Sequence, residues 1–473
     1  MEEFNRDIFE ISEILSESFG DGAGTDNATL ALERIGAVTG NQYLDERGKA
    51  IKAADSLKSG LSLLYQHYCN NGNCDSCPVK KYCNTYIKYR IENYDKSAPV
   101  MVDFFCGSGG LSLGFTQNGF ITSLANDIEP CCVDTYAHNH PEIPRENVVL
   151  GDINKVIEKL PDLLRFKDVD IVVGGPPCQG FSMANRQRLI DDPRNHLYKS
   201  FVKAISIIKP RFFVMENVKG MLPVSGQVVE DFEKIGYTVS RNVLNAKDFG
   251  VPQNRERLIY IGNRCGVDNN QIFADIVESA VHAKSYVLKD AISDLRPLQA
   301  SRTKSATEVG TEESGHIIEQ WKEKEQSTYI QDINQGKRTT LVFNHKARYN
   351  NDRDIEIFGR LEQGDKSDDP KIADIMPYSR RNGIFKDKYF KLEADKVCKT
   401  ITAHMKFDCN MYIHPTQARG LTPREAARVQ SYPDDYFFRG AYTKTYMQIG
   451  NSVPPLLSRA IARVIKEYLE KVR

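Results

Sequence analysis

The chain of 473 residues has no net charge, no long apolar run and no internal repeat. Lys plus Arg and Asp plus Glu each number 63, so the total charge does not mark a nucleic-acid binder. Any contact with a polyanion therefore requires positive charge that is concentrated locally. No stretch of about 18 apolar residues is present, which excludes a membrane-spanning helix. With 41% hydrophobic and 27% charged residues, the composition is that of a globular protein of roughly two to four domains rather than a disordered or fibrous one.

The N-terminus and the cysteines indicate the compartment. The segment MEEFNRDIFE is acidic and has no apolar core, so we expect no secretory signal. The chain has 11 cysteines, an odd number, and four of them crowd into residues 69–83. This pattern favours metal-binding or catalytic thiols over a disulfide framework. We therefore expect a reducing, cytoplasmic location.

Hydrophobic periodicity divides the chain into three parts. Residues 1–96 have helical spacing, and residues 264–395 are polar, loop-rich and contain the single tryptophan, so the latter read as an inserted domain. The remaining part, 97–263 and 396–473, alternates strand-like and helical stretches, which predicts an α/β fold with a mostly parallel sheet covered by helices. The expected helices near its end lie at 423–432 and 453–472, and the expected strands are 100–105, 120–127, 169–175, 211–218, 237–244 and 257–262.

A glycine-rich turn follows the first expected strand in DFFCGSGGLSLGF, residues 103–115. Gly107 and Gly109 allow a tight turn whose backbone N–H groups, with the following helix, approach a ligand. Asp127, at the end of the next expected strand, is the kind of acid that binds ribose hydroxyls in this fold. Ser112 breaks the dinucleotide pattern G-x-G-x-x-G, so a nucleoside ligand fits at least as well as NAD. A tight turn without a ligand is the alternative.

A cysteine follows another strand in GGPPCQGFS, residues 174–182. Two glycines and two prolines would fix the backbone and present Cys178 at the carboxyl end of the strand, where open α/β sheets place their chemistry. As a thiolate, Cys178 would be a strong nucleophile. The alternative is a buried structural cysteine, the usual fate of an isolated one.

Six motifs in order resemble those of the DNA (cytosine-5)-methyltransferases over about residues 100–470. The resemblance implies a Rossmann-like, S-adenosylmethionine-dependent methyltransferase domain at 97–263 and 396–473, a target-recognition region at 264–395, and a helical N-terminal domain at 1–96. It also implies that the enzyme methylates carbon 5 of a flipped cytosine in a specific sequence of double-stranded DNA. The motifs are DFFCGSGGLSLGF, GGPPCQGFS, ENV, QNRERLIYIG, LTPREAARVQSYPDDY and QIGNSVPP.

The resemblance assigns the reaction to four residues. Cys178 would add to carbon 6 of the cytosine, and Glu216 would stabilise the charge near ring nitrogen 3. Arg255 matches a residue that contacts the base, and Arg257 would support the fold or contact the phosphate backbone. We expect a monomer of restriction–modification type, with a cognate restriction endonuclease that forms no stable complex with it.

The resemblance also places S-adenosylmethionine. Asp127 would hold the ribose, Ile128 would lie against the adenine, and Asp152 in GDIN would contact the adenine amino group. Asn451 would reach the methionine end, which requires the C-terminal segment to fold back beside the first motif. The full expected set is Phe105, Gly107, Gly109, Asp127, Ile128, Asp152, Pro177 and Asn451.

Two further segments are expected to contact DNA. Residues 181–198 contain Arg186, Arg188 and Arg194 among polar residues, and the family closes this loop over DNA. Residues 379–399 hold seven Lys or Arg against three Asp or Glu, interleaved with aromatics, which indicates a local phosphate-binding face. A solvated loop is the alternative for each. The aromatic residues are Phe385, Tyr389 and Phe390.

Four N-terminal cysteines have the spacing C-x4-C-x2-C-x5-C: Cys69, Cys74, Cys77 and Cys83. Four thiolates so close together can bind zinc or an iron–sulfur cluster. The last three and the proline after the third resemble the iron–sulfur loop of endonuclease III-type DNA glycosylases, although the first spacing departs from that loop. We therefore expect a metal site, with a [4Fe–4S] cluster preferred over zinc and unligated thiols as the alternative.

Three other functions are alternatives to cytosine-5 methylation of DNA. An RNA methyltransferase of the same fold is less consistent with Gln179, Gly180, Phe181 and Ser182 after the cysteine. A catalytically inactive DNA-binding or cluster-sensing protein is opposed by the intact Cys178, Glu216 and Arg255. An NAD-dependent oxidoreductase would explain only the glycine-rich turn.

Overall fold

The computed structural model describes residues 90–177, 197–303, 310–320, 326–337, 341–377 and 388–473. These residues form two compact units. In its described part, one unit comprises residues 90–93 and Val287–Gly450, and the other comprises Tyr94–Tyr286 and Asn451–Arg473. We call the first the 287–450 unit and the second the sheet unit.

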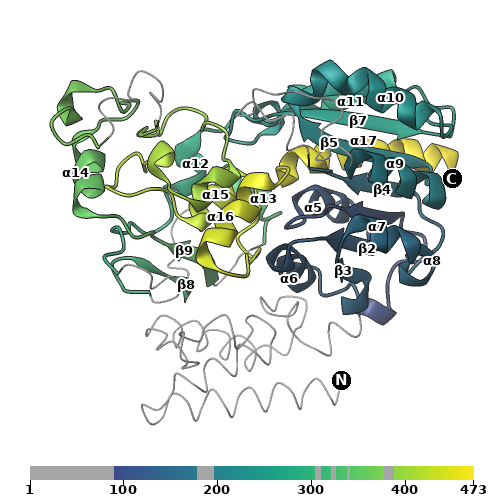
Figure 1. Ribbon diagram of the computed structural model, residues 1–473, viewed down its shortest axis with the longest axis horizontal. Helices are drawn as coiled ribbons and strands as arrows, with labels where there is room; N and C mark the ends of the chain where they lie inside the picture. The colour runs from purple at the N-terminus through teal and green to yellow at the C-terminus, as the bar shows by residue number, and fades with distance from the viewer. Residues whose placement is uncertain (1–89, 178–196, 304–309, 321–325, 338–340, 378–387) are drawn as a thin grey trace, which may run out of the picture. The chain divides into compact units, whose positions relative to one another are not determined.

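The sheet unit contains seven strands in the order β3-β2-β1-β4-β5-β7-β6 (Figure 1). All neighbours pair in parallel from β3 to β5, whereas β7 is antiparallel to both β5 and β6. The central strands are buried on both faces, which is typical of parallel sheets between helices. The strands are β1 Val100–Phe104, β2 Ile121–Asp127, β3 Val148–Leu150, β4 Ile171–Gly174, β5 Phe212–Val218, β6 Thr238–Asn245 and β7 Glu256–Asn263.

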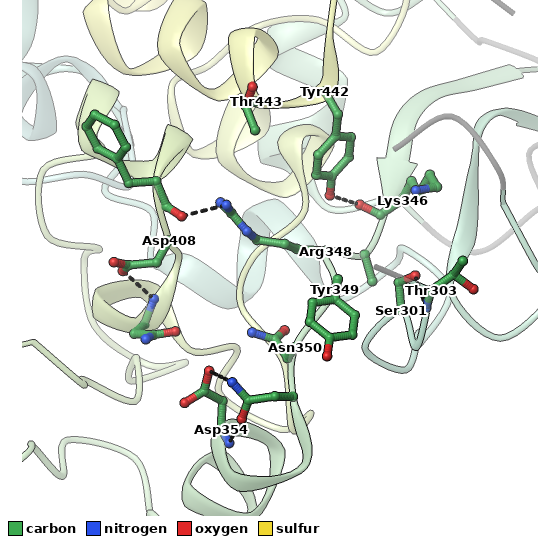
Figure 2. Close-up of a pocket in the computed structure, with 14 residues that line it drawn as sticks. Ser301, Thr303, Lys346, Arg348, Tyr349, Asn350, Asp354, Asp408, Tyr442 and Thr443 are labelled. Carbon is green, nitrogen blue, oxygen red and sulfur yellow. Dashed lines mark hydrogen bonds between the residues drawn. The ribbon is translucent and has the colours of Figure 1, made fainter. Parts of the chain in front are cut away.

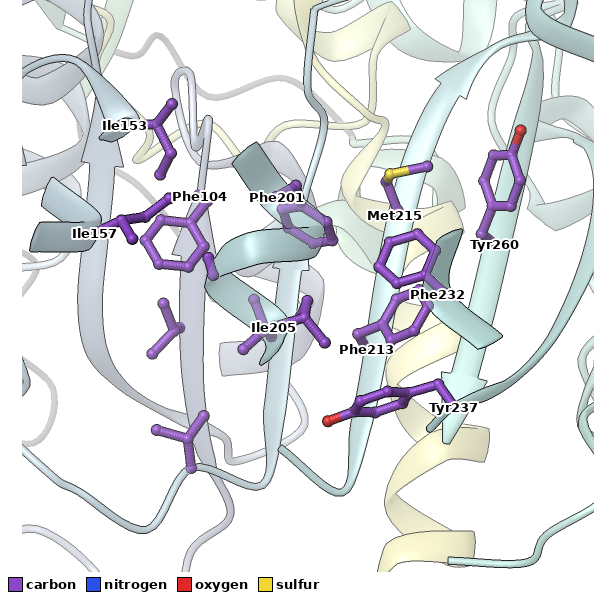
Figure 3. Packing of buried hydrophobic residues seen from close by; sticks show 14 of the residues in the cluster. Phe104, Ile153, Ile157, Phe201, Ile205, Phe213, Met215, Phe232, Tyr237 and Tyr260 are labelled. Atoms are coloured by element: carbon purple, nitrogen blue, oxygen red, sulfur yellow. The ribbon is translucent and has the colours of Figure 1, made fainter. Parts of the chain in front are cut away.

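An aromatic-rich core joins the sheet to the helices on one face (Figure 3). Phe213 of β5 stacks on Phe232 with ring centroids 4.1 Å apart, and Phe201 meets both rings edge-on. Aromatic pairs of this kind add to the free energy gained from burial. Phe201 comes from α9 Leu197–Ile208 and Phe232 from α10 Ser225–Glu233, and α7 Ile153–Glu158 adds aliphatic side chains to the same core. The short helix α8 Leu160–Leu163 follows α7.

The C-terminal helix returns to the beginning of the sheet unit. Helix α17 Pro455–Val472 packs on α5 Gly110–Thr116 and on α11 Asn269–Val281. The Ser458 hydroxyl donates to the carbonyl of Gly110 over 3.0 Å, and a Cβ on Gly114 would lie 2.1 Å from that hydroxyl oxygen. Glycine at 114 therefore permits the close approach of the two helices. Helix α6 Pro130–Asn139 packs against β2 and β3.

The 287–450 unit is organised around buried guanidinium groups. Arg428 is fully buried and binds Asp434 at 2.7 Å and Asp294 at 2.5 Å. Arg419 pairs with Glu425, and Arg424 donates to backbone carbonyls. Buried charges persist only when they are paired in this way. The elements are α12 Leu288–Ile292, β8 Gly315–Gln320, α13 Thr328–Ile333, β9 Leu341–Lys346, α14 Asp352–Arg360, α15 Pro423–Val429 and α16 Tyr442–Asn451, with β8 and β9 antiparallel.

The mostly parallel sheet and its six expected strands are confirmed. Strand β3 was not expected, because it has three residues of which only Val148 is buried. The compact units change at residues 286/287 and 450/451. The expected domain boundaries at 263/264 and 395/396 stay a prediction. Helix α11, which lies within the expected inserted region, belongs to the sheet unit. Among the described residues, no helix is both long and apolar enough to span a membrane.

Candidate active site

The glycine-rich turn joins β1 to α5 with three residues in the left-handed region. Phe105, Gly107 and Gly109 have φ angles of 55°, 53° and 82°. This conformation costs conformational free energy at Phe105, which has a Cβ, whereas glycine adopts it without that cost. A Cβ on Gly107 would meet no atom of the described residues within 4 Å, so the described part of the chain leaves the space beside this turn open. The turn thus presents backbone next to an accessible space.

Asp127 ties the end of β2 to this turn. Its Oδ2 accepts a hydrogen bond from the Gly107 N–H over 2.9 Å, and its Oδ1 accepts from the Glu129 N–H over 2.8 Å. Burial raises the pKa of the Asp127 carboxyl, and these two backbone donors oppose that rise. Each carboxylate oxygen has capacity for a further donor. The sequence-predicted pair of glycine turn and acid is therefore brought together.

Two exposed apolar side chains lie beyond Asp127. Ile128 is 65% exposed, and Leu150, which pairs with Asp127 across β2 and β3, is 51% exposed. Large aliphatic side chains at adjacent strand ends offer an apolar surface to a flat ring. Asp152 caps α7 by accepting from the Asn154 N–H over 2.8 Å. Leu150 was not among the sequence-predicted residues, although it directly precedes the GDIN motif.

Glu216 lies near the carboxyl end of β5 in an ion pair. The Nε of Arg257 is 2.7 Å from its Oε1, and the side chains of Arg257 and Glu216 are only 13% and 11% exposed, respectively. Burial lowers the pKa of the Arg257 guanidinium, and Glu216 opposes the effect. Arg255 is fully buried and donates to the Ser452 carbonyl over 2.7 Å. Of the two predicted arginines, Arg257 is thus the one in contact with the predicted glutamate.

The end of β4 lies beside Glu216. The Asn217 side chain donates to the Pro176 carbonyl over 3.0 Å, and a Cβ on Gly175 would lie 3.0 Å from the Oε2 of Glu216. Pro177 is exposed. The geometry thus brings two predicted motifs, GGPP and ENV, to one place at the carboxyl ends of neighbouring strands. The role of Asn217 in fixing this turn was not predicted.

Several predicted residues lie outside the described residues. They are Cys178, the loop arginines Arg186, Arg188 and Arg194, the aromatic Phe385, and the four N-terminal cysteines Cys69, Cys74, Cys77 and Cys83. Within the part of the chain that the structure describes, no group of three or more His, Cys, Asp or Glu side chains could hold a metal ion. Asn451 is exposed at the end of α16. The C-terminal segment does return beside the first motif, since α17 packs on α5.

The expected phosphate-binding face at 379–399 is wrong in part. Tyr389 is 1% exposed in a hydrophobic cluster, where its hydroxyl donates to Asp354. Lys391 is also buried, and its ammonium group donates to the carbonyls of Phe358 and Leu361. These two side chains stabilise the interior and do not contribute to a surface. The count of basic and aromatic residues could not distinguish burial from exposure.

Comparisons with known proteins place the chain in a family. A family model described as C-5 cytosine-specific DNA methylase matches residues 100–467. Type II methyltransferase M1.HphI of Haemophilus parahaemolyticus is 34% identical over 375 residues, which cover 77% of this chain and 86% of that protein. Type II methyltransferase M.DdeI of Desulfomicrobium norvegicum is 32% identical over 396 residues, covering 79% of this chain and 89% of that protein.

A solved structure has the same fold. It is described as a DNA modification methyltransferase encoded within a prophage of E. coli, and it matches with a TM-score of 0.61 and 24% identity, covering 79% of this chain and all of that one. With the family match over residues 100–467, the chain belongs to the C-5 cytosine-specific DNA methylases, enzymes that methylate carbon 5 of cytosine in DNA.

Proposed function

We propose that this chain transfers a methyl group from S-adenosylmethionine to a cytosine that is flipped out of a specific double-stranded DNA sequence, with Cys178 as nucleophile. The observation that carries the proposal is the meeting of Glu216, Arg257 and the Gly175–Pro177 segment at the ends of β4 and β5. Cys178 directly follows this segment in the sequence. A cytosine bound beside Glu216 would therefore be close to Pro177, the residue that directly precedes Cys178.

The residues of the chain divide the work. The Cys178 thiolate would form a bond to carbon 6 of the ring, so that the electrons of the 5,6 double bond become available at carbon 5. The Glu216 carboxyl group would hydrogen-bond at ring nitrogen 3 and stabilise the charge that develops there. Arg257 would hold that carboxyl group in place through the ion pair. Once carbon 5 carries the methyl group, a base such as water would take the proton from carbon 5, and the thiolate would leave carbon 6 as the 5,6 double bond re-forms.

The residues at the glycine-rich turn fit S-adenosylmethionine. The open space at Gly107 admits a ligand against the backbone, and Asp127 retains acceptor capacity for the two ribose hydroxyls. Ile128 and Leu150 offer an apolar surface to the adenine ring. When bound, S-adenosylmethionine supplies an electrophilic methyl group. We assign Phe105, Gly109, Asp152, Pro177 and Asn451 to the same site from the family resemblance.

Covalent trapping tests the mechanism. Duplex DNA with 5-fluorocytosine at the target should trap the wild-type enzyme covalently. Elimination of the enzyme requires loss of a proton from carbon 5, and fluorine takes the place of that proton. Cys178→Ala should form no adduct and transfer no methyl group, while S-adenosylmethionine still binds. Bisulfite sequencing of DNA from cells that express the chain should identify the target. A Cys178→Ala enzyme that still methylates cytosine would refute the assignment.

The relatives' names support a restriction–modification role, since both are type II methyltransferases. We infer that methylation by this chain protects its target from a cognate endonuclease. Plasmid DNA isolated from expressing cells should resist an endonuclease of the mapped specificity, and DNA from cells with Cys178→Ala should be cut.

We also propose one metal centre at Cys69, Cys74, Cys77 and Cys83, supported by their spacing alone. Anaerobically purified protein should be brown and contain a [4Fe–4S] cluster, or else be colourless with about one zinc per chain. Cys77→Ala should lose the metal and keep S-adenosylmethionine binding. Wild-type protein without metal and with a folded N-terminal region would contradict the proposal.

A further inference from the structure

Arg255 holds the C-terminal segment of the sheet unit from within its interior. The Nη2 of its guanidinium donates to the Ser452 carbonyl over 2.7 Å, although 197 positions separate the two residues. Arg255 is 0% exposed, and its own N–H and carbonyl are hydrogen-bonded to Asn245 and Ala246 at the end of β6. A charged donor fixed in this way restrains the carbonyl that it binds. With no accessible surface, Arg255 acts on the chain around Ser452 rather than directly on a base.

The chain passes from one compact unit to the other just before Ser452. Helix α16 is bound within the 287–450 unit, where the Tyr442 hydroxyl donates to the Lys346 carbonyl at the wall of a cavity of about 330 Å³ (Figure 2). The sheet unit resumes at Asn451. Arg255 therefore fixes the chain at the second residue of its return to the sheet unit.

The segment that follows is short, stiff and buried. Pro454 and Pro455 restrict its backbone at the start of α17, and residues 452–457 are all buried. Asn451, directly before this segment, is exposed. A ligand can therefore reach Asn451, and the position of Asn451 depends on what holds Ser452.

Both ends of this segment lie at parts of the proposed active site. At its far end, the Ser458 hydroxyl donates to the carbonyl of Gly110, the first residue of α5 after the glycine-rich turn. At its near end, Arg255 is two residues from Arg257, which pairs with Glu216. The segment therefore joins the place proposed for the base to the turn proposed for S-adenosylmethionine, within one compact unit.

We propose that Arg255 is a positioning residue for S-adenosylmethionine: through the Ser452 carbonyl it holds Asn451 where the Asn451 side chain contacts the methyl donor. An asparagine amide both donates and accepts hydrogen bonds, so it suits the carboxylate and ammonium groups of the methionine part. This role differs from the base contact expected for Arg255 from the sequence. The inference rests on the proposed function, which assigns S-adenosylmethionine to the glycine-rich turn.

Calorimetry of S-adenosylmethionine binding to the full-length protein, without DNA, tests this role. Asn451→Ala should weaken binding by about tenfold, the loss of one hydrogen bond to a charged group. Arg255→Ala should weaken it by a similar factor, because the Asn451 side chain is no longer held in place. The double variant should bind as weakly as Arg255→Ala alone, since both changes remove the same contact.

Arg165→Ala is the matched control. The Arg165 guanidinium also donates to a backbone carbonyl in the sheet unit, that of Glu142, over 3.1 Å. Its N–H donates to the Ser123 carbonyl near the start of β2, whereas the proposed site lies at the carboxyl ends of the strands. Arg165→Ala should therefore leave the affinity for S-adenosylmethionine unchanged.

Steady-state kinetics separates positioning from a general loss of structure. Arg255→Ala should raise KM for S-adenosylmethionine by about tenfold, with little change in KM for DNA. If melting curves show that Arg255→Ala does not fold, Arg255→Lys replaces it, because lysine keeps a charged donor on a flexible stem. Arg255→Lys should show a smaller loss of donor affinity than Asn451→Ala, and Asn451→Ala should have a smaller effect in this background than in wild type.

Two results would overturn the inference: additive losses in the double variant, or unchanged donor affinity in a folded Arg255 variant. A folded Arg255→Ala protein that binds S-adenosylmethionine normally but no longer forms the adduct with 5-fluorocytosine DNA would show instead that Arg255 acts on the base. A wild type that does not bind the donor would overturn the proposed function together with this inference. A wild type that binds the donor and traps the DNA supports the proposed function whatever the Arg255 variants do, so the two can fail separately.

Discussion

The Nε of Arg257 lies 2.7 Å from the Oε1 of Glu216 in a largely buried ion pair. Arg257 sits on β7 opposite Val218 of β5, two residues beyond Glu216 in the antiparallel register. In this position the guanidinium orients the carboxyl group that we assign to the target base. Arg257 is therefore a positioning residue, and Glu216 is the residue that would touch the substrate.

Removing Arg257 should affect both stability and turnover. Arg257→Ala leaves the Glu216 carboxylate buried without its partner, which should lower the free energy of unfolding by about 3 kcal/mol. Arg257→Lys should recover part of kcat with little change in KM for DNA. Lys219→Ala is the control, since its pair with Glu256 is about half exposed and should contribute less than about 1 kcal/mol. Similar effects of Arg257→Ala and Lys219→Ala in denaturant titrations would contradict this interpretation.

Asp127→Asn should weaken S-adenosylmethionine binding. The amide nitrogen would face one of the two backbone N–H donors that the carboxylate now accepts, and the ribose hydroxyls would lose an acceptor. We expect a loss of roughly 1–3 kcal/mol in binding, measured by calorimetry. Asp162→Asn, an exposed aspartate on α8, should leave the affinity unchanged. Equal affinities of the two variants would remove Asp127 from the site.

Asp103 should make stability depend on pH. Burial raises the pKa of its carboxyl to about 8, and the nearby Ser112 hydroxyl opposes this rise only in part. Between the unfolded pKa of about 3.8 and the folded value of about 8, the unfolded chain releases this proton and the folded chain keeps it. The contribution of Asp103 to stability therefore falls as pH rises through this window and is constant above it.

Asp103→Asn isolates this effect, because asparagine does not titrate. The stability of the variant relative to wild type should rise with pH by at most about 1.4 kcal/mol per unit, and then level off above about pH 8. Unfolding measured at several pH values from 5 to 9 on both proteins provides the comparison. Parallel pH profiles would show that Asp103 is ionised in the folded protein throughout this range.

Gly114→Ala should separate α5 from α17. The new Cβ would lie 2.1 Å from the Ser458 Oγ and 2.3 Å from the Arg459 backbone nitrogen, so the helices must move apart. We expect a destabilisation of about 1–3 kcal/mol or more, seen in thermal unfolding. Gly226→Ala in α10 is the control, since its Cβ would meet no described residue within 4 Å and alanine favours a helix. A Gly114→Ala protein as stable as Gly226→Ala would argue against close packing of these helices.

Local patterns in the sequence were sufficient to predict most strands of the sheet unit and several residues at their ends. Apolar runs identified six of its seven strands, because buried parallel strands are continuous and apolar. The motifs placed Asp127 beside the glycine-rich turn and Glu216 near the segment before Cys178, because strand ends in such a sheet lie at one edge. Strand β3 was not predicted, because three residues are too few to show a hydrophobic periodicity.

Only the tertiary structure decided which side chains meet and which are buried. The register of β5 and β7 selected Arg257 as the partner of Glu216, although Arg255 lies two residues away in the same motif. Packing buried Tyr389 and Lys391 in a stretch that its composition marked as a surface. Asn350 and Phe407 are far apart in sequence and line one cavity. Such outcomes depend on long-range packing and strand register, whereas local patterns report only the periodicity of neighbouring residues.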